Sequence, residues 1–183
     1  MKLKIGRVWS TVGATIDLKN AILNIKDGGS NSLEVVIGEG NFTYTEKKTR
    51  EYKLNRGVLN TVRNADEEPI DISFDFEWEY IKGPSTSSTV SGGVGTPTIE
   101  DCLKNVGGAA DWASSDSDSC NPYAVDLELV YTPPCSGVQG DIETITISDF
   151  RYEQLAHDAS AGSIACTGRA NVTDAVAVRT AQT

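Results

Sequence analysis

Histidine is almost absent from this sequence of 183 residues, which contains only His157. Any mechanism that uses imidazole as an acid, a base or a metal ligand would have to centre on that residue. We interpret its segment, residues 152–158, as a loop, where a histidine beside an aspartate more often makes a structural hydrogen bond. The sequence also lacks a GxSxG nucleophile elbow and a glycine-rich phosphate loop. We therefore expect a protein that is not an enzyme and that needs no cofactor.

Long apolar runs are absent as well. No segment approaches the roughly 20 apolar residues of a membrane helix, and residues 1–20 lack the apolar centre of a signal peptide. Acidic residues outnumber basic residues by 26 to 16, which gives a net charge of −10. Such a protein repels nucleic acid and anionic membranes. We expect a soluble protein of one domain that stays where it is made and binds neither membrane nor DNA in the usual way.

Cysteine is scarce, and its spacing does not fit a zinc site with paired CxxC motifs. The four cysteines are Cys102, Cys120, Cys135 and Cys166. In a reducing compartment we expect them to be small buried apolar residues, with a disulfide between Cys120 and Cys135 as the alternative. Asp116 and Asp118 could hold calcium, but their segment lacks the glycine and the closing glutamate of an EF-hand loop. A solvated acidic turn is the preferred interpretation, so we expect no metal.

Charge is distributed unevenly along the chain. Residues 1–63 hold 11 basic and 6 acidic residues, a balance of +5, and residues 64–183 hold 5 and 20, a balance of −15. The basic excess is concentrated in the run from Lys47 to Arg56. This run can be a solvated hairpin, or it can meet the acidic part of another copy of the chain.

The dominant period of the sequence is two residues, which is typical of β-strands. In residues 70–80 every even position is apolar or aromatic, and every odd position is polar. We predict a long strand with Phe74, Phe76 and Trp78 on its packed face and acidic residues on its wet face. Residues 123–131 repeat the pattern, and a Thr-Pro-Pro sequence ends them. Shorter strands are predicted at residues 21–26, 33–37, 41–44, 142–147, 163–171 and 175–179, separated by turn residues.

One segment, residues 97–106, has the features of a helix. Thr96 is the expected N-cap, Pro97 suits the first helical position, and Gly107 can end the helix. Ile99, Leu103 and Val106 would form its apolar stripe. The preceding residues 83–96 are rich in Gly, Ser and Thr and are expected to form a flexible loop. Many short strands with one amphipathic helix predict a mainly β fold, a β-sandwich or barrel with a flanking helix.

Several segments together resemble the major tail tube protein of long-tailed bacteriophages. They are GEGNFTYTEK (residues 38–47), EYKLNRGVL (51–59), DISFDFEWEYI (71–81), TPTIEDCLKN (96–105), SDSCNPYAVDLELVYTPPC (117–135) and ISDFRYEQLAHDASAGSIACTGRANV (147–172). The similarity is general, without a short diagnostic motif, and covers most of residues 21–179.

The resemblance implies a single tail tube domain over residues 1–183, with an N-terminal arm at 1–20 and a basic loop or hairpin at 45–63. It implies self-assembly into hexameric rings whose strands join a ring-wide inner barrel and which stack into a hollow tube. Genomic DNA would pass through this tube to the host without being specifically bound. The expected partners are further copies of the chain and the tape measure, tail terminator and distal tail proteins, with a sheath as a further option. The expected location is the tail of a virion assembled in the bacterial cytoplasm.

The resemblance also suggests roles for two sets of charged residues. The acidic wet faces would line the lumen and repel phosphate; these candidates are Asp71, Asp75, Glu77, Glu79, Asp126 and Glu128. The basic segment would contact a neighbouring subunit through Lys47, Lys48, Arg50, Lys53 and Arg56.

Three other interpretations remain at this stage. The acidic face can be an ordinary solvated sheet surface. The chain can be a monomeric β-sandwich module that binds a carbohydrate or a protein, although most of its aromatic residues fall on the inward phases of strands. An enzyme would need chemistry at His157 or at the pair Asp75 and Glu77, and two neighbouring odd positions of one strand are a weak indication of such a pair.

Overall fold

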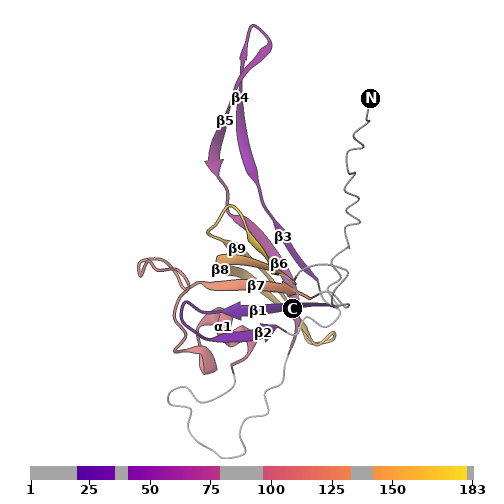
Figure 1. The fold of residues 1–183 in the computed structure, drawn as a ribbon. Coiled ribbons are helices and arrows are strands. Elements are labelled where there is room, and N and C mark those ends of the chain that lie inside the picture. Colours follow the sequence, from indigo (N-terminus) through magenta and orange to yellow (C-terminus); the bar gives the residue numbers. More distant parts are fainter. Residues whose placement is uncertain (1–19, 36–40, 79–96, 133–141, 181–183) are drawn as a thin grey trace, which may run out of the picture.

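The computed structural model describes residues 20–35, 41–78, 97–132 and 142–180. The fold is mainly β, as the sequence predicted. Eight strands form an antiparallel sheet: β1 (Ala21–Lys26), β2 (Ser32–Val35), β3 (Phe42–Thr45), β6 (Ile70–Glu77), β7 (Val125–Tyr131), β8 (Ile142–Asp158), β9 (Ser163–Ala170) and β10 (Val176–Thr180). Their order is β2-β1-β7-β8-β9-β6-β3, and β10 also pairs with β8 (Figure 1).

Strand β8 belongs to two parts of this sheet. Its first half pairs with β7 on one edge and with β10 on the other, and its second half pairs with β9. Between the halves Asp149 adopts a left-handed backbone conformation, with φ at 58°. Its N–H donates to Oδ1 of Asp126 at 3.0 Å, where the register of β7 and β8 shifts. Such a bulge bends a strand, so the two parts of the sheet can fold over one core.

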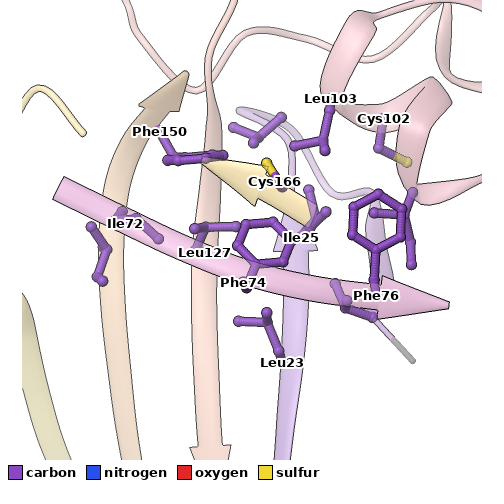
Figure 2. Packing of buried hydrophobic residues seen from close by; sticks show 14 of the residues in the cluster. Leu23, Ile25, Ile72, Phe74, Phe76, Cys102, Leu103, Leu127, Phe150 and Cys166 are labelled. Atoms are coloured by element: carbon purple, nitrogen blue, oxygen red, sulfur yellow. The ribbon is translucent and has the colours of Figure 1, made fainter. Parts of the chain in front are cut away.

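The core is formed by the inner faces of both parts. In Figure 2 strand β6 crosses the strands of the other part, and its buried side chains meet theirs. Phe74 of β6 packs against Phe150 of β8 with the ring centroids 5.9 Å apart. Leu23, Ile25 and Leu127 are fully buried in the same cluster. The arrangement is a β-sandwich whose two layers share β8.

Helix α1 (Ile99–Lys104) covers one end of the core and is shorter than the predicted residues 97–106. Its N-cap is Thr98 rather than Thr96, because the Thr98 hydroxyl and the Asp101 carboxylate form a reciprocal capping box. Asn105, in a left-handed conformation, ends the helix before Val106. Val106 is therefore outside the helix and exposed, whereas Ile99 and Leu103 pack on the core as expected. A short 3-10 helix (Gly107–Ala109) follows.

Strands β4 (Lys48–Asn55) and β5 (Val58–Glu67) form a separate two-stranded sheet. This hairpin projects from the rest of the molecule (Figure 1). Every residue of β4 is exposed, and Ala65 is the only residue of β5 that is half-buried. The basic run therefore forms a hairpin, and whether the hairpin is solvated or meets another copy of the chain stays a prediction.

The structure corrects two further expectations. Trp78 lies past the end of β6 and is 46% exposed, so it is not a core residue. The segment 152–158 is not a loop, because β8 continues to Asp158 and includes His157. These two residues lie side by side: the rings of Trp78 and His157 pack edge to face, with their centroids 5.2 Å apart.

The three described cysteines have free thiols. Cys102 and Cys166 are buried, as expected, and burial raises the pKa of each to about 12. Cys120 is exposed, so the expectation of burial is wrong for this residue, and its suggested disulfide partner Cys135 lies outside the described residues. Glu79, the arm at 1–19 and the predicted flexible loop up to residue 96 also lie outside them.

Candidate assembly surfaces

The outer face of β3, β6 and β9 is polar, and we call it the acidic face. In register across these strands it presents Thr43, Thr45, Asp71, Ser73, Asp75, Glu77, Ser163, Ala165, Thr167 and Arg169. Three of the six lumen candidates, Asp71, Asp75 and Glu77, therefore lie together. They stand on the opposite side of β6 from Phe74 and Phe76, as the period of two predicted.

The carboxylates of this face differ in their electrostatic surroundings. Asp71 is paired with Lys47 and accepts a hydrogen bond from Nε of Arg169 at 3.0 Å. The hydrogen bond from Lys47, helped by Arg169 and opposed by partial burial, lowers the pKa of Asp71. Asp75 and Glu77 have no ion pair with any residue that the structure describes. The uncompensated negative charge of the face is therefore concentrated at these two positions.

Asp126 and Glu128 lie on the other layer. They are on the outer face of β1, β7, β8 and β10, across the core from the acidic face. Glu128 pairs with Lys26 at 2.6 Å, and Asp126 holds the bulge of β8. The described lumen candidates thus occupy two different faces of the sandwich.

The outer face of the β1 layer is distinguished by apolar residues, and we call it the valine face. Ile22, Val130, Thr144 and Val178 lie in one row across β1, β7, β8 and β10. The next row is Asn24, Glu128, Thr146 and Val176. Ile22, Val176 and Val178 are well exposed. This layer therefore presents an apolar row to solvent, and the row beside it contains Glu128, which is paired with Lys26.

The β4–β5 hairpin has one apolar and one polar face. The pairs Tyr52–Val62 and Leu54–Leu59 lie on the first, which we call the apolar hairpin face, and Arg50 pairs with Asn64 beyond them. The opposite face contains Glu51, Lys53, Asn55, Val58, Thr61 and Arg63. All four apolar side chains of the apolar hairpin face are exposed.

The basic candidates divide into two groups. Lys47 and Lys48 are near the base of the hairpin, where they pair with Asp71 and Asp174 on the body of the molecule. The hydrogen bond from Lys48 lowers the pKa of Asp174. Arg50, Lys53 and Arg56 lie further out and have no acidic partner among the described residues. Arg56 and Gly57 form the tight turn at the tip, both with positive φ.

Chemistry at the other candidate groups is limited. Nε2 of His157 lies 3.3 Å from Oε1 of Glu100, which also pairs with Lys104, so this histidine links β8 to helix α1. Asp116 pairs with Arg151 at 2.6 Å and accepts from the Asp118 N–H at 2.9 Å, which closes an ordinary acidic turn. Within the described residues no group of three potential metal ligands comes together. Nor do these residues include a helix that is long and apolar enough to cross a membrane.

The arrangement is a β-sandwich with a projecting hairpin, and solved structures resemble its fold. The chain resembles one in the tube terminating cap of the anti-feeding prophage (AFP), with a TM-score of 0.53 and 10% identity over 98% of this chain and 99% of that one. It also resembles a chain of the extracellular contractile injection system PVC, solved as the sheath/tube terminator in the extended state, with a TM-score of 0.51 and 12% identity over 91% and 99%.

A third structure, the PVC sheath-tube complex in the extended state, has a TM-score of 0.51 and 11% identity over 92% of this chain and 94% of that one. At these identities the likeness establishes the fold. No family model matches the sequence, and no curated protein matches it. These three structures come from injection-system and prophage assemblies, and none of the three is a major tail tube protein of a long-tailed phage.

Proposed function

We propose that this protein is a structural subunit of the tube of a phage tail or a related contractile injection system. The observation that carries the proposal is the likeness, over at least nine-tenths of this chain, to chains solved within sheath-tube and tube-terminating assemblies. The subunits form hexameric rings that stack or that end the tube. Their partners are further copies of the chain and the other tail proteins, including a sheath where the tail is contractile.

Three strands that each pair with a single described strand support self-assembly. β2 and β3 are the two ends of the sheet path, and β10 pairs with β8 alone among the described strands. Exposed strand edges promote aggregation in a monomer, and pairing with identical neighbours removes them. The hairpin supports the same conclusion, because an isolated two-stranded sheet is marginal in water and gains stability when a partner covers it.

We further propose that the acidic face lines the channel. Asp75 and Glu77 have no ion pair among the described residues, and their register partners on β9 are the small residues Ala165 and Ser163. Such a wall would repel the phosphates of DNA and offer no apolar surface to which it could adhere. Asp126 and Glu128 do not share this face, so the proposed lining is narrowed to the acidic face.

Electron microscopy of the purified protein over a range of concentrations tests the proposal. Hollow rings or tubes are expected, either spontaneously or after addition of a tail initiation complex. A protein that stays monomeric at high concentration and is not incorporated into tails would instead favour a monomeric binding module.

A further inference from the structure

Strand β10 is attached to the fold differently from the other strands of the large sheet. Its residues Val176, Ala177, Val178 and Thr180 are all exposed. Every other strand of this sheet has at least one buried or half-buried side chain. Among the described strands, β10 pairs with β8 alone. It is therefore held in place mainly by main-chain hydrogen bonds.

A strand held in this way is close to the balance between binding and release. In water the net gain from one main-chain hydrogen bond is of the same order as the entropy lost when one residue is fixed. The other strands add buried apolar side chains to this balance, such as Leu23 and Ile25 in β1, and the described side chains of β10 add none. We therefore expect β10 to leave β8 and return to it readily.

The segment before β10 shows where the strand can swing out. Val172 is fixed, because it packs on the core and its carbonyl accepts a hydrogen bond from the first N–H of β6 at 3.1 Å. The link that follows, residues 173–175, has weaker contacts. Asp174 pairs with Lys48, with both side chains about half-exposed, and the N–H after Asp174 donates to the exposed carboxylate of Glu46 at 2.8 Å. Exposed charge contacts of this kind contribute little to stability.

Resting on the proposed function, we propose that β10 is exchanged between neighbouring subunits, so that β10 of one copy pairs with β8 of the next. The five register pairs of the two strands, from Val176–Thr146 to Thr180–Ile142, would all form again between the copies. Exchange therefore costs no ladder contact, and in a ring the neighbour is present at a high effective concentration. The neighbour's strand replaces β10 instead of lying beside it, so a continuous backbone links the two subunits.

A second copy fits the β8 edge better than a foreign extended peptide does. A sheet edge binds a visiting strand through the main chain, and the alternate side chains give specificity. Ala177 lies opposite Ile145, which is only 8% exposed, and Val176 and Val178 continue the valine face on the other side of the strand. A foreign strand would need the same small residue in the same register, and β10 of another copy has it.

The link sets a distance limit for the exchange. Val172 stays with its own core, so residues 173–175 must span the gap to β8 of the neighbour. Three extended residues reach about 10 Å. The β8 edge of one subunit must therefore lie within this reach of Val172 in the next subunit.

Disulfide trapping between copies tests the exchange. Thr144 and Val178 are opposite residues of β8 and β10, and opposite residues of antiparallel strands lie within disulfide reach. Thr144→Cys protein is mixed with Val178→Cys protein, both carrying Cys120→Ser and Cys135→Ser, and the mixture is oxidised after assembly. About half of the Thr144→Cys chains should appear as cross-linked dimers on a non-reducing gel, since each β8 receives β10 from either protein with equal chance. Circular dichroism checks that each variant is folded.

A matched control lies in the same row of the valine face. Ile22→Cys and Val130→Cys replace opposite residues of β1 and β7. This pair has the same hydrogen-bonding type as Thr144 and Val178, because pair types alternate across a row of an antiparallel sheet. Strand β1 is anchored by fully buried side chains, so it should not exchange. The mixture of these two proteins should give no cross-link above the background of each protein alone.

Hydrogen exchange in the free wild-type protein gives an independent measurement. The amides of residues 176–180 that face β8 should exchange at least about tenfold faster than the paired amides of β9, because β10 opens without disturbing the core. Equal protection of the two strands would contradict the inference.

The possible outcomes separate the inference from the proposed function. If the wild type assembles and the mixture of Thr144→Cys and Val178→Cys proteins gives no more cross-link than the control mixture, the exchange inference is wrong and the proposed function stands. If the wild type neither assembles nor enters tails, the proposed function is contradicted, whereas cross-linked dimers in the mixture would still show exchange between copies.

Discussion

Asp27 accepts a hydrogen bond through Oδ2 from the backbone N–H of Ala113 at 3.2 Å, although 86 positions separate the two residues. The same carboxylate accepts from the N–H of Gly29 at 2.9 Å and from the N–H and Nδ2 of Asn31 at 2.8 and 2.7 Å. Burial raises the pKa of Asp27, but these hydrogen bonds outweigh it and lower the pKa below 3.8. One buried carboxylate therefore ties the β1–β2 turn to the segment after helix α1.

The first prediction concerns this carboxylate. Asp27→Asn should lower the free energy of unfolding by about 2–4 kcal/mol at pH 7, because the amide places an NH₂ group among N–H donors. The pKa of Asp27 is lower in the folded state, so its contribution is complete above about pH 4 and is lost as the pH falls through the folded pKa. Urea unfolding at pH 7 and pH 3 should show the difference shrinking in acid. Asp111→Asn, at an exposed site on the same segment, is the control, and a difference that is independent of pH would contradict the assignment.

A second prediction uses the close approach of Gly28 to this segment. The Gly28 N–H donates to the carbonyl of Ala113 at 3.0 Å, and a β-carbon on Gly28 would lie 2.0 Å from the carbonyl oxygen of Ser114. Gly28→Ala should therefore destabilise the protein by at least about 2 kcal/mol, measured by thermal unfolding. Gly29→Ala is the matched control, since its nearest contact is the Asp27 side chain at 3.3 Å. Equal effects of the two changes would show that the turn is less tightly packed than described.

Tyr123 supports a third prediction. Its hydroxyl is buried and has no hydrogen-bond partner among the described residues, and burial raises the pKa of the phenol. Removing an unsatisfied polar atom relieves its desolvation cost, so Tyr123→Phe should leave stability unchanged or raise it by up to about 1–2 kcal/mol. Urea unfolding measures this. A clear loss of stability would mean that the hydroxyl has a partner outside the described residues.

The elements that could be predicted from the sequence are those whose residues alternate cleanly. β6 and β7 follow the period of two, and their buried residues are the predicted ones, apart from Trp78. The second half of β8 was missed because Arg151, Glu153 and Gln154 interrupt the period where a bulge shifts the register of β8 against β9. Bulges are set by pairing with distant strands, which a local pattern does not contain.

The candidate surfaces were predictable only in part. The acidic face followed directly from the alternation in β6. The placement of Asp126 and Glu128 on the other layer depends on the bend at Asp149, so their charge alone could not separate them from Asp71. The apolar hairpin face could not be predicted from the basic run either. It depends on the pairing of Tyr52 with Val62 and of Leu54 with Leu59, which is set by the register of the hairpin.

The fourth prediction tests the proposed channel lining. Asp75→Lys together with Glu77→Lys should leave the core face of β6 intact, so tubes should form normally. Passing DNA would then meet cations that exchange with its counterions, which makes transit slower and more dependent on salt. The rate of DNA ejection from particles with the doubly substituted protein measures this, with Asp111→Lys as the control. Ejection at the wild-type rate in low salt would rule out an electrostatic role for the acidic face.

The fifth prediction separates the two groups of basic residues. Replacing Arg50, Lys53 and Arg56 by glutamate should slow assembly several-fold and leave the fold unchanged, because these cations have no partner within the described part of the chain. A high salt concentration should also slow assembly of the wild type, because it screens the same charges. Light scattering follows the growth, and unchanged growth would assign these cations to a solvated surface.

Lys47→Glu should act differently. It reverses the charge of a partner of Asp71 at the base of the hairpin, so its main effect should be on the anchoring of the hairpin to β6. Faster hydrogen exchange in residues 48–67 is the expected readout, and exchange at the wild-type rate would indicate that this ion pair is dispensable.

The bend of β8 has a geometrical consequence for any closed assembly. Because β8 runs through both layers, the bulge at Asp149 sets the angle between the acidic face and the valine face. Two hydrogen bonds hold this bulge: the Asp149 N–H donates to Asp126, and the N–H of Asn171 donates to the Asp149 carbonyl at 3.2 Å. If the acidic face turns toward the central axis of a ring and the valine face contacts a neighbouring subunit, this angle determines the curvature of the ring. In the proposed ring, the number of subunits around the axis would then depend on the backbone geometry at Asp149.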